Sequence, residues 1–198
     1  MSCTANFPDH LLNLIKKSKY LHLATSSTEC VPSISLMNYI YVPQDKLFRP
    51  ADIYDYIIFA TPQNTEKYHN MEANPVVALL FHDWVTANNL SIKKKSLSQT
   101  NTPEPGASGI VESAPPSKLL NLLQELNQAE LNEMSATIIG HAYIVSQDSE
   151  EESHYKKLLL KVNPDASAFI LGEETVVVKV KIESCKVTDT SNNTKIYT

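Results

Sequence analysis

Residues 56–84 read YIIFATPQNTEKYHNMEANPVVALLFHDW, two apolar runs with a polar segment between them. The apolar runs are rich in Ile, Val, Phe and Leu, which predicts buried strands over 56–61 and 76–84. The polar segment begins after a turn-forming Thr-Pro pair and stops at an Asn-Pro pair, so it predicts a short helix over 65–73. We therefore expect a strand–helix–strand unit in which the helix starts directly after the first strand.

The start of this helix carries residues suited to binding an anion. A helix N-terminus presents unpaired N–H groups and a partial positive charge. Thr61 ends the strand, Thr65 or Asn64 is suited to cap the helix, and Lys67 lies in its first turn. We expect Thr61, Thr65 and Lys67 to converge on one phosphate group. The alternative is a capping threonine beside a surface lysine.

The same reading predicts four further strands. Alternating or β-rich runs cover residues 20–26, 31–42, 136–146 and 175–189. Six strands with few helices favour a mainly β (α+β) fold, a closed or nearly closed antiparallel barrel. Closure removes the exposed edges that an open sheet would present.

Helical patterns and one insertion accompany the strands. Residues 8–18 carry an apolar stripe, and residues 149–164 begin with a capping-box pattern, Ser-x-x-Glu. Residues 86–118 are rich in Ser, Thr, Asn and Pro, which predicts a polar loop insertion, and a leucine-faced helix is expected over 119–131. We expect a single domain over residues 1–198, with the helices at its periphery.

Composition argues against several classes of function. The formal net charge is −5, whereas binding to phosphate backbones needs clustered Lys and Arg, so we expect no nucleic-acid partner. No apolar run approaches the roughly 20 residues of a membrane helix, so no membrane partner is expected. The N-terminal residues do not resemble a secretory signal, and the three widely spaced cysteines do not suggest a disulfide framework. We expect a cytoplasmic location, with the nucleus left open.

The sequence identifies no catalytic residue and no metal ligands. The six histidines make no ligand pair at helical spacing and there is no CxxC, so no metal site is expected. The patterns GxSxG, GxxxxGK and GxGxxG are absent, and with four glycines a glycine-cradled phosphate is excluded.

The order of these elements resembles a known family, the pyridoxamine-5′-phosphate-oxidase-like, FMN-binding split-barrel proteins. The segments that carry the resemblance are SISLMNYIYV (33–42), IIFAT (57–61), TEKYHNMEANPVVALLF (65–81) and ATIIGHAYIV (136–145). It covers residues 20–86 and 135–189. The resemblance implies a six-stranded antiparallel split β-barrel with peripheral helices.

The family likeness also implies a partner and a cofactor. Members are usually homodimers with FMN in two equivalent clefts at the dimer interface. By this resemblance, the strand from Ser33 to Asn38 would run beside the flavin ring, and backbone groups of Ser35, Leu36 and Met37 would face the ring edge.

Four more residues are assigned to FMN by the same resemblance. Thr61 would lie near the ribityl chain or the phosphate. Glu66 and Lys67 occupy the positions of an Arg-Lys pair, and Lys67 would pair with the phosphate. Ser135 matches a position that reaches FMN from the second subunit.

The chain departs from the family pattern where the oxidases carry cations. Ser33 replaces an arginine, Asn38 a lysine and Glu66 an arginine, while residues 185–193 replace a basic, His-containing motif that grips the substrate phosphate. These changes argue against oxidation of a vitamin B6 phosphate. We therefore expect an FMN-dependent oxidoreductase of unknown small-molecule substrate. The alternative is a non-catalytic split-barrel binding protein that has lost oxidase activity.

Overall fold

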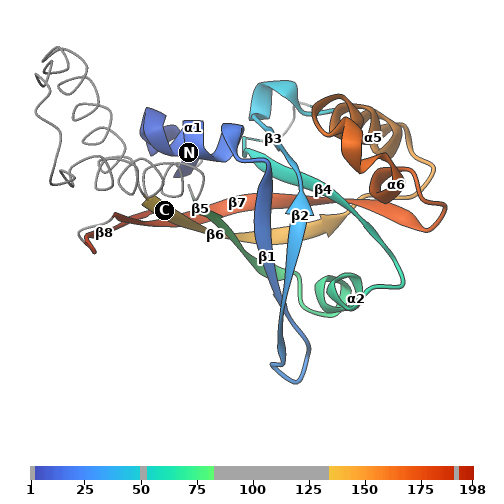
Figure 1. The fold of residues 1–198 in the computed structure, drawn as a ribbon, viewed down its shortest axis with the longest axis horizontal. Coiled ribbons are helices and arrows are strands. Elements are labelled where there is room, and N and C mark those ends of the chain that lie inside the picture. Colours follow the sequence, from blue (N-terminus) through green and yellow to red (C-terminus); the bar gives the residue numbers. More distant parts are fainter. Residues whose placement is uncertain (1–2, 50–52, 83–133, 190–191) are drawn as a thin grey trace, which may run out of the picture.

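The computed structural model describes residues 3–49, 53–82, 134–189 and 192–198 (Figure 1). The insertion expected at 86–118 and the helix expected at 119–131 lie outside these residues. The strands are β1 (Tyr20–Ser26), β2 (Pro32–Asn38), β3 (Ile40–Val42), β4 (Tyr56–Pro62), β5 (Val76–His82), β6 (Met134–Ile144), β7 (Thr175–Asp189) and β8 (Thr194–Tyr197). The α-helices are α1 (Asp9–Lys17), α2 (Glu66–Ala73), α5 (Glu150–Val162) and α6 (Ser167–Ile170), and short 3-10 turns are η1 (Cys3–Asn6), η2 (Gln44–Lys46) and η3 (Pro164–Ala166).

The described strands form one antiparallel sheet that curls on itself. Their order is β2-β1-β5-β6-β7-β4-β3, and β8 pairs with β7. β2 and β3 stand at opposite ends of this order, yet Tyr39 alone separates them in the sequence. Because the chain passes from one edge strand to the other in one residue, the sheet must bend until the end of β2 reaches the start of β3, and the two edges do not pair with each other (Figure 1). The predicted antiparallel split barrel with peripheral helices is confirmed.

The described sheet has eight strands where the sequence predicts six. The strand predicted over 31–42 divides at Tyr39 into β2 and β3, because the chain changes edges there. β8 is missed because its four residues are mostly exposed and too short to show a period.

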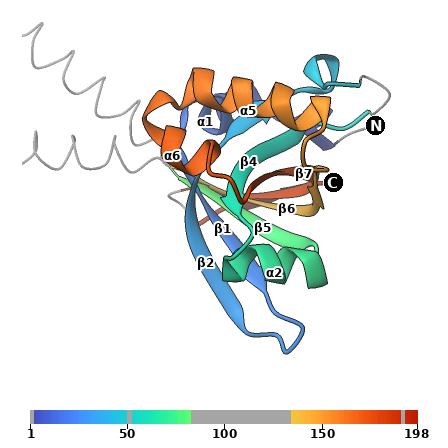
Figure 2. The same ribbon diagram turned by 90° about the vertical axis from the view of Figure 1, so that its right-hand side faces the viewer.

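β4 is buried on both of its faces. Ile57 and Phe59 point into the barrel interior, and Ile58 between them packs in a second apolar cluster with residues of α5 and α6. All three side chains are fully buried, each worth about 1.5–3 kcal/mol. Burial on both sides explains why the β4 sequence is an unbroken apolar run rather than an alternating one. Figure 2 shows α5 and α6 together at the top of the molecule and α2 at the bottom.

The start of α5 follows the predicted capping chemistry with one shift, whereas the cap expected from Asn64 or Thr65 at the start of α2 is not formed. Ser149 Oγ accepts a hydrogen bond from Glu152 N at 3.1 Å, which starts α5. The Glu152 carboxylate accepts from Asp148 N at 2.9 Å rather than from Ser149 N, so the return bond falls one residue earlier. Among the described residues, no helix is long and apolar enough to span a membrane.

Tyr39, the residue between β2 and β3, is held from three directions. Its hydroxyl donates to Ile15 O of α1, and its ring packs edge-on against Phe81 with 5.3 Å between centroids. Its carbonyl accepts from Asn163 Nδ2 at 3.2 Å. Burial raises the pKa of the Tyr39 hydroxyl well above its ordinary value. The seam of the barrel is therefore fixed to α1, to the core and to the end of α5.

Gly140 lies where β6 and β7 shift register, between Ile139 and Gly140. A Cβ at this position would stand 2.4 Å from Lys181 O and 2.6 Å from Val180 Cγ1. The backbone of β7 therefore approaches β6 more closely than any side chain permits.

Substitution of Gly140 by alanine should destabilise the barrel. The new methyl group meets a backbone oxygen that cannot turn away, so we expect Gly140→Ala to lower the free energy of unfolding by at least about 1–3 kcal/mol. Gly172→Ala is the matched control, because its Cβ would meet only the rotatable Thr175 hydroxyl, at 2.8 Å. Chemical denaturation of both variants checks this, and an equal cost for the two would contradict the close approach at Gly140.

Removal of the Asn163 amide should weaken the seam. Asn163 is 7% exposed, and its Nδ2 also donates to Leu159 O at 3.3 Å. Asn163→Ala leaves the Tyr39 and Leu159 carbonyls without this donor, so the free energy of unfolding should fall by about 1–3 kcal/mol. The exposed Asn64 provides a control, for which Asn64→Ala should change it by less than about 0.5 kcal/mol. Denaturation curves that show no difference between the two would exclude a structural role for the contact.

Candidate functional site

The turn between β4 and α2 brings the predicted threonines together. Thr61 is fully buried at the end of β4, and its Oγ1 lies 3.2 Å from Thr65 Oγ1. Thr65 Oγ1 donates to Pro62 O at 2.8 Å, and no side chain of the part of the chain that the structure describes caps α2. Since the first amides of an α-helix have no intrahelical acceptor, the Glu66 and Lys67 N–H groups are open to a ligand.

Lys67 is half-buried in the first turn of α2. Loss of water lowers the pKa of its ammonium group, and the adjacent Glu66 carboxylate opposes this shift. Within the described residues no hydrogen bond or ion pair joins the Lys67 ammonium to another side chain. A partly desolvated cation of this kind gains from a bound anion or acceptor.

Ser33 and Glu66 also meet, although 33 positions separate them in the sequence. Ser33 Oγ at the start of β2 donates to Glu66 Oε2 at 3.3 Å. α2 is anchored to the same hairpin by Asn70 Nδ2, which donates to Thr25 Oγ1 of β1 at 3.1 Å. We call Ser33, Thr61, Thr65, Glu66 and Lys67 the α2 site.

β2 offers a strand edge beside the α2 site. It pairs with β1 and ends the strand order, so no described strand pairs with its other edge. Met37 points into the core, whereas Leu36 is 59% exposed on the opposite face. Ser35 is half-buried on the same side as Met37. Unpaired backbone N–H and C=O groups along such an edge suit the polar rim of a planar ring.

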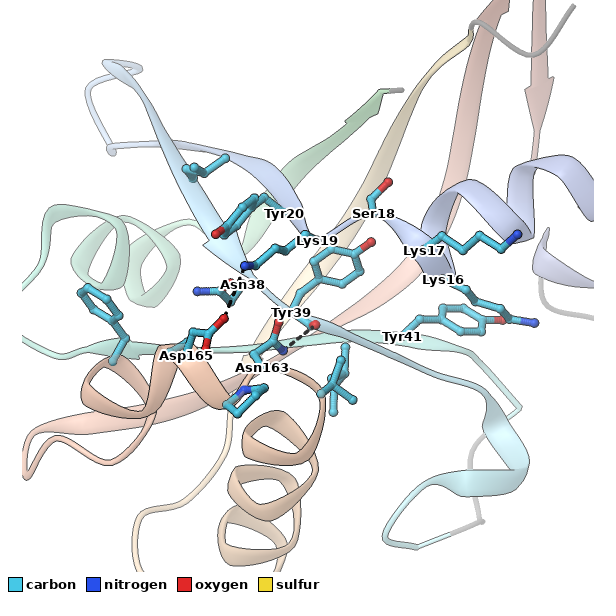
Figure 3. Close-up of a pocket in the computed structure, with 16 residues that line it drawn as sticks. Lys16, Lys17, Ser18, Lys19, Tyr20, Asn38, Tyr39, Tyr41, Asn163 and Asp165 are labelled. Atoms are coloured by element: carbon cyan, nitrogen blue, oxygen red, sulfur yellow. Dashed lines mark hydrogen bonds and ion pairs between the residues drawn. The ribbon is translucent and has the colours of Figure 1, made fainter. Parts of the chain in front are cut away.

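The far end of β2 opens onto a pocket of about 670 Å³, here called the β2 pocket. Leu36 and Asn38 line it from β2, and Phe169 lines it from α6. Figure 3 shows Lys19 reaching toward Asp165, and the Lys19 Nζ to Asp165 Oδ2 distance is 3.6 Å. Closure of the barrel thus places Asn38 beside a cavity large enough for a small organic molecule.

Sequence reasoning did not find Lys19, Asn163 or Asp165. Lys19 comes from the turn between α1 and β1, and the other two from the turn between α5 and α6. Long-range contacts, among them the bond from Asn163 to the Tyr39 carbonyl and the Lys19–Asp165 ion pair, bring these segments together, and no local pattern signals them.

Ser135 does not join the α2 site within one chain. It lies at the start of β6, paired with His82 at the far end of β5. α2 precedes the other end of β5, at Val76, which is about 20 Å away along the strand. A role for Ser135 in the same cleft requires a second copy of the chain.

The fit of a flavin nucleotide to these residues is uneven. Helix amides, paired hydroxyls and an ammonium group suit a hydroxylated or anionic tail, and the β2 edge suits a ring. The Glu66 carboxylate stands at the same place and does not suit a phosphate. The charged residues that the family uses at Ser33 and Asn38 are absent.

Comparisons with known proteins agree with this architecture. The family model described as pyridoxamine 5'-phosphate oxidase matches residues 7–186. A pyridoxamine 5'-phosphate oxidase homologue of Saccharomyces cerevisiae is 57% identical over 195 residues, 98% of this chain and 96% of that protein. A Schizosaccharomyces pombe homologue is 31% identical, over 92% of this chain and 85% of its own length.

Solved structures share the fold at low identity. A heme binding protein from Mycobacterium smegmatis has a TM-score of 0.57 and 14% identity, and the match covers 97% of this chain and 59% of that one. A protein of the pyridoxinephosphate oxidase family from Clostridium acetobutylicum has a TM-score of 0.52 and 11% identity, with 94% and 90% covered. The sequence matches go further than these fold matches, and they show that the chain belongs to the pyridoxamine 5'-phosphate oxidase-like split-barrel family.

Proposed function

We propose that the chain binds a flavin, with FMN as the family cofactor, and acts as an oxidoreductase on a small molecule. The observation that carries this proposal is the α2 site. Among the described residues, its ammonium group has no side-chain partner, its helix start has no side-chain cap, and its two hydroxyls lie beside the edge of β2 that pairs with no strand. Family membership supplies the identity of the ligand, by analogy.

A bound flavin supplies the electron-accepting chemistry itself, which explains why the sequence needs no acid–base pair or nucleophile. The residues of this chain then have three tasks. Lys67 and the threonines hold the tail, the β2 edge orients the ring, and the β2 pocket admits the substrate next to Asn38. The substrate remains a small molecule of unknown identity.

A second candidate is a non-catalytic split-barrel binding protein that has lost oxidase activity. Glu66 favours it, because a carboxylate bonded to Ser33 replaces cations that would strengthen flavin binding. The two candidates differ in turnover: an oxidoreductase reduces its flavin with an electron donor and reoxidises it, whereas a binding protein does not.

We propose a homodimer that uses the outer face of β2, β1, β5 and β6. A row of apolar residues crosses these strands in register: Ile34, Ala24, Ala78 and Ile139. α1 and α2 pack into the barrel interior and α5 and α6 cover β4 and β7, so no described helix covers this face. A second copy on this face would bring its own Ser135 toward the cleft.

A cytoplasmic location fits the free thiols of Cys3, Cys30 and Cys185.

Purified protein should show a flavin absorption band, either as isolated or after FMN is added. FMN at 100 times its dissociation constant should raise the free energy of unfolding by about 2.7 kcal/mol. Lys67→Ala removes a charge-assisted hydrogen bond and should weaken FMN binding by about 10- to 150-fold. Lys157→Ala, at an exposed position of α5, is the control and should bind as the wild type does. Protein that gains no stability with FMN, or that carries a heme Soret band instead, would contradict the proposal.

A single charged substitution on the proposed dimer face tests whether the dimer uses it. Ile34 is 71% exposed, so Ile34→Asp should leave the monomer folded, but a dimer would bury the new carboxylate. We expect the dimer dissociation constant to rise by about 100-fold. Leu171→Asp, at a 59% exposed position after α6, should have no effect. Light scattering after size exclusion measures both, and a wild-type monomer at all concentrations would exclude the proposed dimer.

A further inference from the structure

The tail end of the proposed flavin site holds acidic residues as well as Lys67. Lys67 contributes a cation, and Glu66 is its immediate neighbour on α2. Gln63 N in the preceding turn donates to Glu174 O at 2.9 Å. This bond places the start of β7, with the exposed Glu173 and Glu174, beside the same turn.

The Glu66 carboxylate is held over the start of β2. Ser33 Oγ donates to Glu66 Oε2 at 3.3 Å, at two positions where the family likeness places arginines. Two phosphate-binding cations are thus replaced by a hydroxyl bonded to a carboxylate. A carboxylate accepts hydrogen bonds from hydroxyl groups and repels phosphate oxygens.

The ribityl tail of a flavin ends in a phosphate in FMN and in a hydroxyl in riboflavin, and these two groups interact differently with Glu66 and Lys67. A phosphate monoester carries about −1.5 to −2 charges at neutral pH. Lys67 attracts that charge, but the carboxylate of Glu66, the adjacent residue, repels it. A terminal hydroxyl instead donates to Glu66 and accepts from Lys67 or from the first amides of α2.

We infer that the α2 site recognises the ribityl chain of a flavin and gains nothing from its phosphate, so that riboflavin binds at least as tightly as FMN. The inference rests on the proposed flavin function. It identifies Glu66, at a position where the family likeness places an arginine, as the residue that sets the preference between the two flavins.

The direct test is a pair of titrations of the full-length protein with riboflavin and with FMN. Quenching of flavin fluorescence in one low-salt buffer yields both dissociation constants. We expect riboflavin to bind as tightly as FMN or more tightly, with a margin of about threefold for the measurement. Added salt should favour FMN relative to riboflavin, because it screens the repulsion.

Substitution of Glu66 separates its charge from its shape. Glu66→Gln keeps a hydrogen-bond acceptor for Ser33 and removes the negative charge. It should tighten FMN binding by about tenfold and leave riboflavin binding within about threefold. Glu29→Gln, exposed between β1 and β2, removes the same charge away from the site and should leave both constants unchanged.

The outcomes distinguish this inference from the proposed function. Wild-type protein that binds FMN more than about threefold more tightly than riboflavin overturns the inference and leaves the flavin function intact. An unchanged ratio of the two constants in Glu66→Gln overturns the role of Glu66. If neither flavin binds at any concentration tested, the proposed function fails, and the inference fails with it.

Discussion

The fold depends on the passage of the chain from one edge of the sheet to the other at Tyr39. The strand order leaves β2 and β3 at opposite ends, and one residue joins them, so the sheet has no flat alternative. The contacts of Tyr39 with Ile15, Phe81 and Asn163 then hold this seam. The edge of β2 and the β2 pocket both exist because the barrel closes there.

The sequence predicts the elements better than it predicts their junctions. The apolar runs at 56–61 and 76–84 and the helix between them are close to β4, β5 and α2, because hydrophobic period and proline positions are local signals. The break at Tyr39 carries no such signal. A run of β-forming residues reads as one strand whether or not it changes edges, and a four-residue edge strand such as β8 has no measurable period.

In the candidate site, too, contacts between residues near in sequence are predictable, and contacts between distant segments are not. Thr61 and Thr65 lie four positions apart across one turn, so their contact follows from sequence spacing. The contact between Ser33 and Glu66 depends on how α2 packs against the hairpin, and only the family likeness placed these two residues at one site. Lys19 and Asp165 have no local pattern at all, because η3 and the start of β1 meet only in the closed barrel.

β7 lies between β6 and β4 in the sheet, yet it follows every other strand except β8 in the sequence. During synthesis on the ribosome, β4 emerges more than a hundred residues before β7, and until then the edge of β4 opposite β3 has no sheet partner. Pairings this distant in sequence slow folding and prolong exposure to aggregation. The nascent chain therefore depends on its last long strand to complete the sheet, and a chain that ends before β7 leaves this edge of β4 open.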